Sequence, residues 1–162
     1  MQVQLVGVTE SERQANSLIK YLEEAGVLAC HPRYDALNSW LATVLADQHI
    51  YLTFASRESC PNAVIEALAH GLVVVAPDSG GMQELLGSTA VLFPEPEKEQ
   101  FWAPLRLEAS VPRPDFSSVL KALLDAYQEL AELQALSLRR SREELSLQTI
   151  ARRYAEVLTT FA

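Results

Sequence analysis

The sequence predicts an α/β fold, a doubly wound, Rossmann-like parallel sheet followed by C-terminal helices. Short apolar runs alternate along the chain with stretches of helical period, as expected for strands joined by crossover helices. Residues 72–76 are apolar on both faces, as strands are when helices cover both sides of a parallel sheet. The 162 residues are 49% hydrophobic and carry no internal repeat, which favours a single domain over residues 1–162.

The alternation begins at the N-terminus and continues to residue 93. Strands are predicted where short apolar runs occur, at residues 3–8, 27–30, 50–54, 72–76 and 91–93. Helices are predicted between them, at residues 10–24, 35–46, 61–69 and 83–86. Pro61 fits the first position of a helix, and Gly71 closes the same helix.

The rest of the chain predicts a surface excursion and then C-terminal helices over residues 116–162. Residues 94–115 are rich in proline and break the alternation, which is typical of a surface segment. Helical spacing resumes from Phe116 to Tyr127, and a final helix carries apolar residues at Tyr154, Val157, Leu158 and Phe161.

Charge and composition exclude several classes of protein. The net charge of −8 and pI near 4.9 exclude a nucleic-acid partner, because binding to a phosphate backbone needs a basic face. Residues 1–8 have neither the basic region nor the long apolar core of a signal peptide, and no apolar run reaches the roughly 20 residues that a membrane span needs, so we expect a cytoplasmic protein. Basic residues near the C-terminus indicate a solvated helix face, with a membrane-surface helix as the alternative. They are Arg139, Arg140, Arg142, Arg152 and Arg153.

The two cysteines indicate neither a disulfide framework nor a metal site. Cys30 lies in a predicted strand and Cys60 in a predicted loop, without the spacing of zinc ligands. We expect reduced thiols and no bound metal.

Ligands of doubly wound sheets bind outside the carboxyl ends of the strands, so two loops there are candidate binding segments. Residues 55–62 leave a strand and enter the predicted helix at Pro61. The amide groups at a helix N-terminus attract phosphate, although many α/β loops offer the same feature.

Glu66 is the unusual residue of the helix that follows. It lies in the sequence Ala-Val-Ile-Glu-Ala-Leu-Ala, where a buried carboxylate without a partner would be costly. Either Glu66 occupies the one wet face of the helix, or it accepts hydrogen bonds from a sugar diol.

The second loop, residues 77–82, contains Gly80 and Gly81. Paired glycines allow positive φ and a close approach of the backbone to a ligand, and they are also common in plain turns. The dinucleotide fingerprint GxGxxG is absent.

Together these loops resemble the signature region of the retaining GT-B glycosyltransferases known as family 4. Glu58 and Glu66 match the family's E-x7-E motif, and residues 61–68 and 71–76 resemble its flanking pattern. Residues 79–86 resemble the family's glycine loop. The similarity covers most of the chain except residues 94–115.

The resemblance implies the C-terminal, donor-nucleotide-binding half of a GT-B fold. In it, Glu58 would be the catalytic residue near the transferred sugar, and Glu66 would hold the ribose hydroxyls. The backbone at Ser59, Cys60, Pro61 and Asn62 would approach the diphosphate of a nucleoside-diphosphate sugar, with Gly80 and Gly81 nearby. The resemblance implies no cofactor and no metal.

The family's first strand and helix of this half, which carry the Arg and Lys that clamp the diphosphate, have no counterpart in this sequence. We therefore expect an acceptor-binding N-terminal half in the same or another chain, and no turnover by these residues alone. Arg57 is a candidate substitute for the clamp, or it points to solvent or pairs with a carboxylate. The alternatives to a transferase are a non-catalytic nucleotide-sugar-binding or scaffold module and an epimerase of the same fold.

Overall fold

The computed structural model describes residues 3–6, 17–26, 28–31, 40–55, 57–95 and 115–160, which fall into two compact units, Met1–Val44 and Leu45–Ala162. The proposed single domain over residues 1–162 stays a prediction. Most of the predicted excursion at 94–115 lies outside the described residues.

The described part of the first unit contains two strands and a helix in βαβ order, followed by most of α3 (Trp40–Ala46). Strands β1 (Val3–Val6) and β2 (Leu28–His31) pair in parallel, with Val3 opposite Leu28 and Val6 opposite His31. The helix α2 (Ser17–Glu24) lies between them in sequence. The predicted strands are confirmed here, and residues 7–16 of the predicted first strand and helix lie outside the described part.

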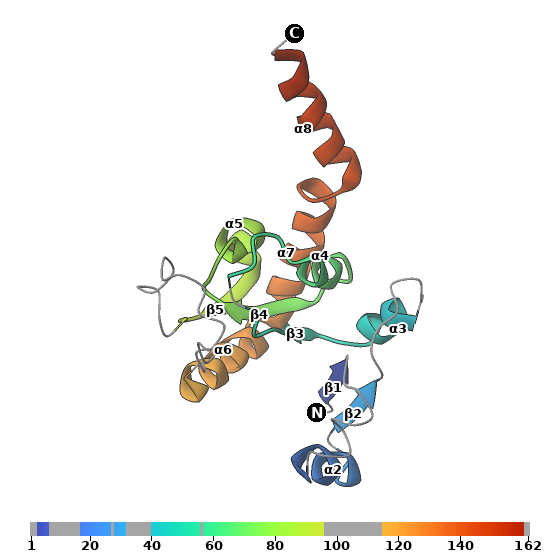
Figure 1. The fold of residues 1–162 in the computed structure, drawn as a ribbon, viewed down its shortest axis with the longest axis vertical. Helices are drawn as coiled ribbons and strands as arrows, with labels where there is room; N and C mark the ends of the chain where they lie inside the picture. Colours follow the sequence, from blue (N-terminus) through green and yellow to red (C-terminus); the bar gives the residue numbers. More distant parts are fainter. Residues whose placement is uncertain are drawn as a thin grey trace, which may run out of the picture. The chain divides into compact units, whose positions relative to one another are not determined.

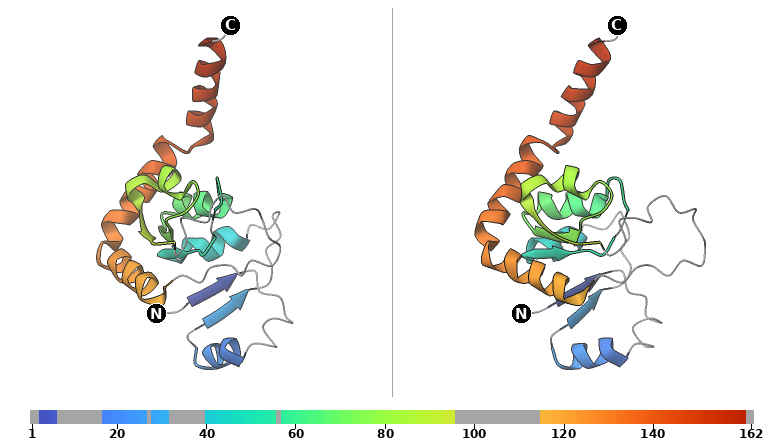
Figure 2. Two further views of the ribbon diagram at one scale, coloured as in Figure 1. Left: turned by 60° about the vertical axis from the view of Figure 1, so that its left-hand side comes forward. Right: turned by 90° about the vertical axis from the view of Figure 1, so that its left-hand side faces the viewer.

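The second unit is built on a three-stranded parallel sheet in the order β3-β4-β5. The strands are β3 (Ile50–Leu52), β4 (Val73–Pro77) and β5 (Ala90–Phe93). Figures 1 and 2 show α4 (Asn62–Ala69) and α5 (Met82–Leu86) on one side of this sheet and α6 (Phe116–Gln128) on the other. A 3-10 turn, Gly87–Thr89, joins α5 to β5, and α3 (Trp40–Ala46) precedes β3. Parallel strands with helices on both faces confirm the predicted α/β class.

The core of the second unit surrounds β4, whose residues are all buried. Successive side chains of a strand point to opposite faces, so β4 supplies apolar groups to both layers. On the α6 face, Val73 and Val75 form one cluster with Phe93 and with residues of α6 and the helix after it. Ile50 of β3 packs against that cluster, so the Ile50 side chain points to the α6 face of the sheet.

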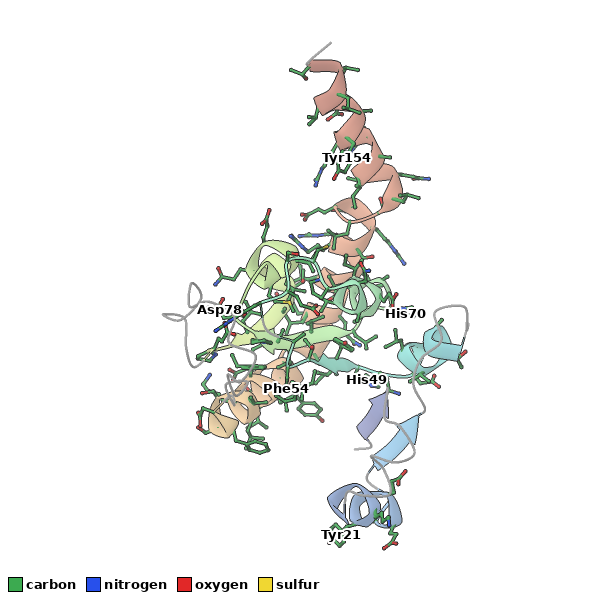
Figure 3. All side chains as sticks on the ribbon, in the orientation of Figure 1. Tyr21, His49, Phe54, His70, Asp78 and Tyr154 are labelled. Atoms are coloured by element: carbon green, nitrogen blue, oxygen red, sulfur yellow. The ribbon has the colours of Figure 1, made fainter. Side chains whose placement is uncertain are left out.

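The C-terminal region contains one helix more than predicted, since α7 (Leu130–Glu143) and α8 (Leu147–Thr160) follow α6. Helix α7 belongs to the core through Leu133 and Ser137 and packs against α4. Helix α8 has no buried residue, and Tyr154, labelled in Figure 3, is 68% exposed. The final helix is thus confirmed, whereas its described apolar positions are not part of the core.

One of the C-terminal arginines departs from the predicted solvated face. Arg140 is only 18% exposed, and its Nε and Nη2 donate to the carbonyl oxygens of Leu85 (2.7 Å) and Glu84 (2.8 Å). These carbonyls belong to the last turn of α5, which has no partners for them within the helix. Arg140 therefore caps α5, a role that pattern alone did not indicate.

Candidate donor site

The first candidate loop leaves β3 while still hydrogen-bonded to the sheet. The backbone N–H of Thr53 donates to the carbonyl of Val75 (3.0 Å), and the N–H of Ala55 donates to the Thr53 hydroxyl oxygen (3.1 Å). These bonds fix the direction in which the chain enters the loop. They also hold the Thr53 hydroxyl at the carboxyl end of the strand.

The loop then enters α4 with Pro61 as the N-cap, so the helix begins at Asn62, one residue after the predicted start at Pro61. Pro61 is buried in an extended conformation, and no side chain caps the helix. Ser59, Cys60 and Asn62 are exposed, and Cys60 is a free thiol. The N-terminal end of α4, with its positive dipole, therefore borders an exposed polar loop.

The second candidate loop is joined to the first by backbone contacts. It begins at Asp78, labelled in Figure 3, whose N–H donates to the carbonyl of Phe93 (2.8 Å). The N–H of Gly81 donates to the carbonyl of Glu58 (2.9 Å), and the N–H of Arg57 donates to the Ser79 hydroxyl (2.7 Å). The two loops thus form one hydrogen-bonded unit.

The glycine pair is explained by this contact between the loops. Gly80 has a φ of 58°, and a Cβ there would overlap the carbonyl oxygen of Glu58. A Cβ on Gly81 would overlap the carbonyl oxygen of Ser59. The predicted close approach therefore exists, and its partner is the backbone of the neighbouring loop. Contact of these glycines with a ligand stays a prediction.

Arg57 has the backbone conformation that side chains rarely adopt, with a φ of 62°. Its guanidinium Nε lies 4.0 Å from Oε1 of Glu95, and the two side chains are 38% and 9% exposed. Of the alternatives given by the sequence, pairing with a nearby carboxylate is the one present in this structure.

Glu58 and Glu66 are both exposed, and their charges act on the phenol of Tyr51. Burial raises the pKa of Tyr51, a hydrogen bond with Thr53 opposes that rise, and the charges of Glu58 and Glu66 add to it. The phenol of Tyr51 therefore lies within electrostatic reach of both carboxylates. Glu66 is exposed on α4, which is compatible both with a solvated helix face and with a carboxylate that binds a sugar diol.

The sequence gives no reason to single out Tyr51, because it lies within an apolar strand. The available signal was alternation: if Ile50 points into the core, its neighbour points to the opposite face, where α4 lies.

Within the described residues, no group of three or more His, Cys, Asp or Glu side chains is arranged to hold a metal ion. In the same part of the chain, no helix has the length and hydrophobicity to cross a membrane.

Comparison with known families gives a match over residues 1–106, to the family described as glycosyl transferases group 1. The chain belongs to this family. The match spans the first unit and the part of the second that carries both candidate loops. A comparison with curated protein sequences gives no match.

Solved glycosyltransferase structures share the fold of this group 1 chain. The pneumococcal O-GlcNAc transferase GtfA, solved with UDP and GlcNAc, is 14% identical with a TM-score of 0.69 over 99% of this chain and 30% of its own. Sucrose-phosphate synthase from Thermosynechococcus elongatus is 18% identical with a TM-score of 0.69 over 99% of this chain and 38% of its own. Anabaena HepE, solved with UDP, is 16% identical with a TM-score of 0.61 over 99% of this chain and 41% of its own. The chain thus spans less than half the length of each of these proteins.

Proposed function

We propose that this chain is the donor-binding half of a retaining, family 4 glycosyltransferase of GT-B fold. It binds a nucleoside-diphosphate sugar, and the sugar passes to an acceptor held by an N-terminal half in the same or another chain. The observation that carries the proposal is the hydrogen-bonded pair of loops at the start of α4, which fixes the backbone of Glu58 just before the helix that carries Glu66. The family match and the UDP complexes of GtfA and HepE support it.

Each carboxylate has a distinct role in the proposal. Glu66, exposed on α4, accepts hydrogen bonds from the two ribose hydroxyls, since a carboxylate offers two acceptor oxygens. Glu58 lies near the transferred sugar and is the catalytic residue. Its backbone carbonyl is occupied by Gly81, which holds the loop without using the side chain.

The diphosphate is met by amides and by one cation. The backbone from Ser59 to Asn62 and the uncapped end of α4 supply partial positive charge. Arg57, whose side chain is 38% exposed, supplies a full charge, and its planar group can bind phosphate with two donors. The reaction in this proposal uses no metal.

The alternative is a non-catalytic module of the same fold that binds the nucleotide sugar without turnover. The two functions share the ligand and differ in chemistry. Incubating the full-length protein with a nucleoside-diphosphate sugar and following release of the free nucleoside diphosphate distinguishes them. Release above the uncatalysed rate supports the transferase, and tight binding without release supports the module.

Calorimetric titration with UDP, GDP and ADP tests the site itself. We expect one diphosphate to bind, and Glu66→Gln to weaken it about tenfold, because hydrogen bonds to a charged acceptor are the stronger ones. Arg57→Ala is expected to weaken the diphosphate and leave the matching nucleoside unchanged. Unchanged affinity in Glu66→Gln would assign Glu66 to a merely solvated helix face, and equal losses for both ligands would remove Arg57 from the phosphate site.

A further inference from the structure

Among the residues that the structure describes, Arg57 is the one non-glycine residue with a positive φ, at 62°. Left-handed backbone costs free energy for a residue with a side chain, because its Cβ comes close to the following carbonyl oxygen. Such a conformation persists only where surrounding contacts impose it. Arg57 directly precedes Glu58, so the contacts that impose its conformation also shape the candidate donor site.

Two hydrogen bonds from the second loop hold the Arg57–Glu58 segment at its two ends. The N–H of Arg57 donates to the Ser79 hydroxyl oxygen at 2.7 Å, and the carbonyl of Glu58 accepts from the N–H of Gly81 at 2.9 Å. A Cβ added to Gly80 would lie 3.1 Å from the carbonyl carbon of Arg57, so the two loops are in direct backbone contact. The φ and ψ of Arg57 lie between the two hydrogen bonds and are fixed from both sides.

Only one of these two hydrogen bonds depends on a side chain, and that side chain is Ser79. Ser79 is 7% exposed, and its own carbonyl accepts the N–H of Met82 at 3.2 Å, at the start of α5. The hydroxyl therefore projects from a backbone segment anchored between β4 and α5. Replacing Ser79 by alanine removes the acceptor of the Arg57 N–H and leaves the rest of the contact between the loops in place.

The φ angle of Arg57 sets the direction in which its side chain leaves the loop. Rotation about the N–Cα bond carries Cβ with it, so a change from 62° to the ordinary range near about −60° turns the side chain by roughly 120°. In the present conformation the guanidinium Nε lies 4.0 Å from Oε1 of Glu95, and the Arg57 side chain is 38% exposed. The Ser79 hydroxyl thus controls where the guanidinium lies.

We propose that Ser79 is a positioning residue of the donor site, whose buried hydroxyl holds Arg57 in the left-handed conformation and so directs its guanidinium to the diphosphate. This inference rests on the proposed function, in which Arg57 binds the diphosphate. Ser79 acts on the ligand only through Arg57, so its loss affects only ligands that carry the diphosphate.

Calorimetric titration of the full chain tests this dependence on Arg57, using UDP, GDP or ADP, whichever wild type binds, and the matching nucleoside. We expect Ser79→Ala to weaken the diphosphate about threefold to tenfold, up to the effect of one hydrogen bond from a charged donor, and to leave the nucleoside unchanged. In an Arg57→Ala background, Ser79→Ala should cause no further loss, because the side chain that it positions is absent. Equal losses for the two ligands, or the same loss in the Arg57→Ala background, would overturn the inference.

Two further variants separate the Ser79 hydroxyl from a general effect of a buried serine. Ser79→Thr keeps a hydroxyl, so it should bind the diphosphate more tightly than Ser79→Ala. Ser137→Ala removes another buried hydroxyl, which donates to the carbonyl of Thr89 at 3.4 Å, and it should bind the diphosphate as wild type does. Equal affinities of the two Ser79 variants, or a loss in Ser137→Ala as large as that in Ser79→Ala, would overturn the inference.

Amide hydrogen exchange of wild type provides a measurement that needs no variant. Arg57 lies on an exposed loop, but its hydrogen bond to a buried hydroxyl should slow exchange of its amide about tenfold or more relative to an unstructured chain. Exchange of the Arg57 amide at the unstructured rate would overturn the inference. If wild type binds a diphosphate and Ser79→Ala binds it equally well, the inference alone is wrong. If wild type binds no nucleoside diphosphate, the proposed function is wrong and the inference with it.

Discussion

Replacing Gly80 by alanine tests whether the two site loops are held together as described. Gly80 has a φ of 58°, and left-handed backbone costs an alanine about 1–2 kcal/mol. The new Cβ also overlaps the Glu58 carbonyl, a backbone atom that cannot move aside without breaking the bond from Gly81. Losing that bond adds about 1 kcal/mol, so we expect a total loss of about 2–3 kcal/mol in the free energy of unfolding.

Gly71→Ala is the matched control within the same unit. Gly71 also has a positive φ, 75°, but its Cβ would meet the side chain of Leu138, which can shift. Urea denaturation gives the two free energies, and amide hydrogen exchange gives the state of the Gly81 bond. We expect the Gly81 amide to exchange about tenfold faster in Gly80→Ala and unchanged in Gly71→Ala. A Gly80→Ala variant with wild-type exchange at Gly81 would refute the reasoning.

Two further predictions concern stability away from the site. Arg140→Ala is expected to lower the free energy of unfolding by about 2 kcal/mol, because the Arg140 guanidinium caps α5. The control is Arg139→Ala, which should change that free energy by less than about 0.5 kcal/mol because the Arg139 side chain is 67% exposed. Similar losses for the two variants in urea denaturation would contradict the capping role of Arg140. Hydrogen bonds from Ser117 and Ser118 lower the pKa of Asp115, the N-cap of α6, to about 2. Its stabilisation is therefore present above its ordinary pKa near 3.8 and lost as the pH falls towards 2. Between those values the urea midpoint of wild type should fall more than that of Asp115→Asn, and parallel curves would disprove this role.

The strand and helix around the site were predictable because residues with strong local preferences mark where each begins and ends. Strand β4 is an uninterrupted apolar run, and α4 is bounded by Pro61 and Gly71, so both were placed to within about one residue. The fold class followed from their alternation. The two candidate loops followed from the rule that ligands bind at the carboxyl ends of parallel strands.

Contacts between elements far apart in sequence were not predictable. The spacing of apolar residues indicates that a segment is a helix, but it does not show which surface the helix packs against. On α6, the small residues Ala122 and Ala126 are buried, whereas Phe116 and Leu124 are exposed. Helix α7 was missed although it packs on α4, since its sequence is more polar than that of the other core helices. The role of Arg140 was not predictable either, because the carbonyl groups that it caps lie 55 and 56 residues away in sequence.

Substitutions in the candidate site fall into two classes, those that change a side chain facing the ligand and those that change the backbone contact between the two loops. Glu58 is held by its own carbonyl and Arg57 by its own N–H, so the loop is fixed through the backbone and the Glu58 carboxylate stays exposed. Replacing the Glu58 or Glu66 side chain should therefore change ligand binding with little effect on folding. Replacing Gly80 or Gly81 should change both, because the backbone that positions the carboxylate moves with the loop. A variant that binds the ligand more weakly but keeps the wild-type free energy of unfolding therefore identifies a side chain that faces the ligand. A variant that loses both affinity and stability identifies the backbone that positions those side chains.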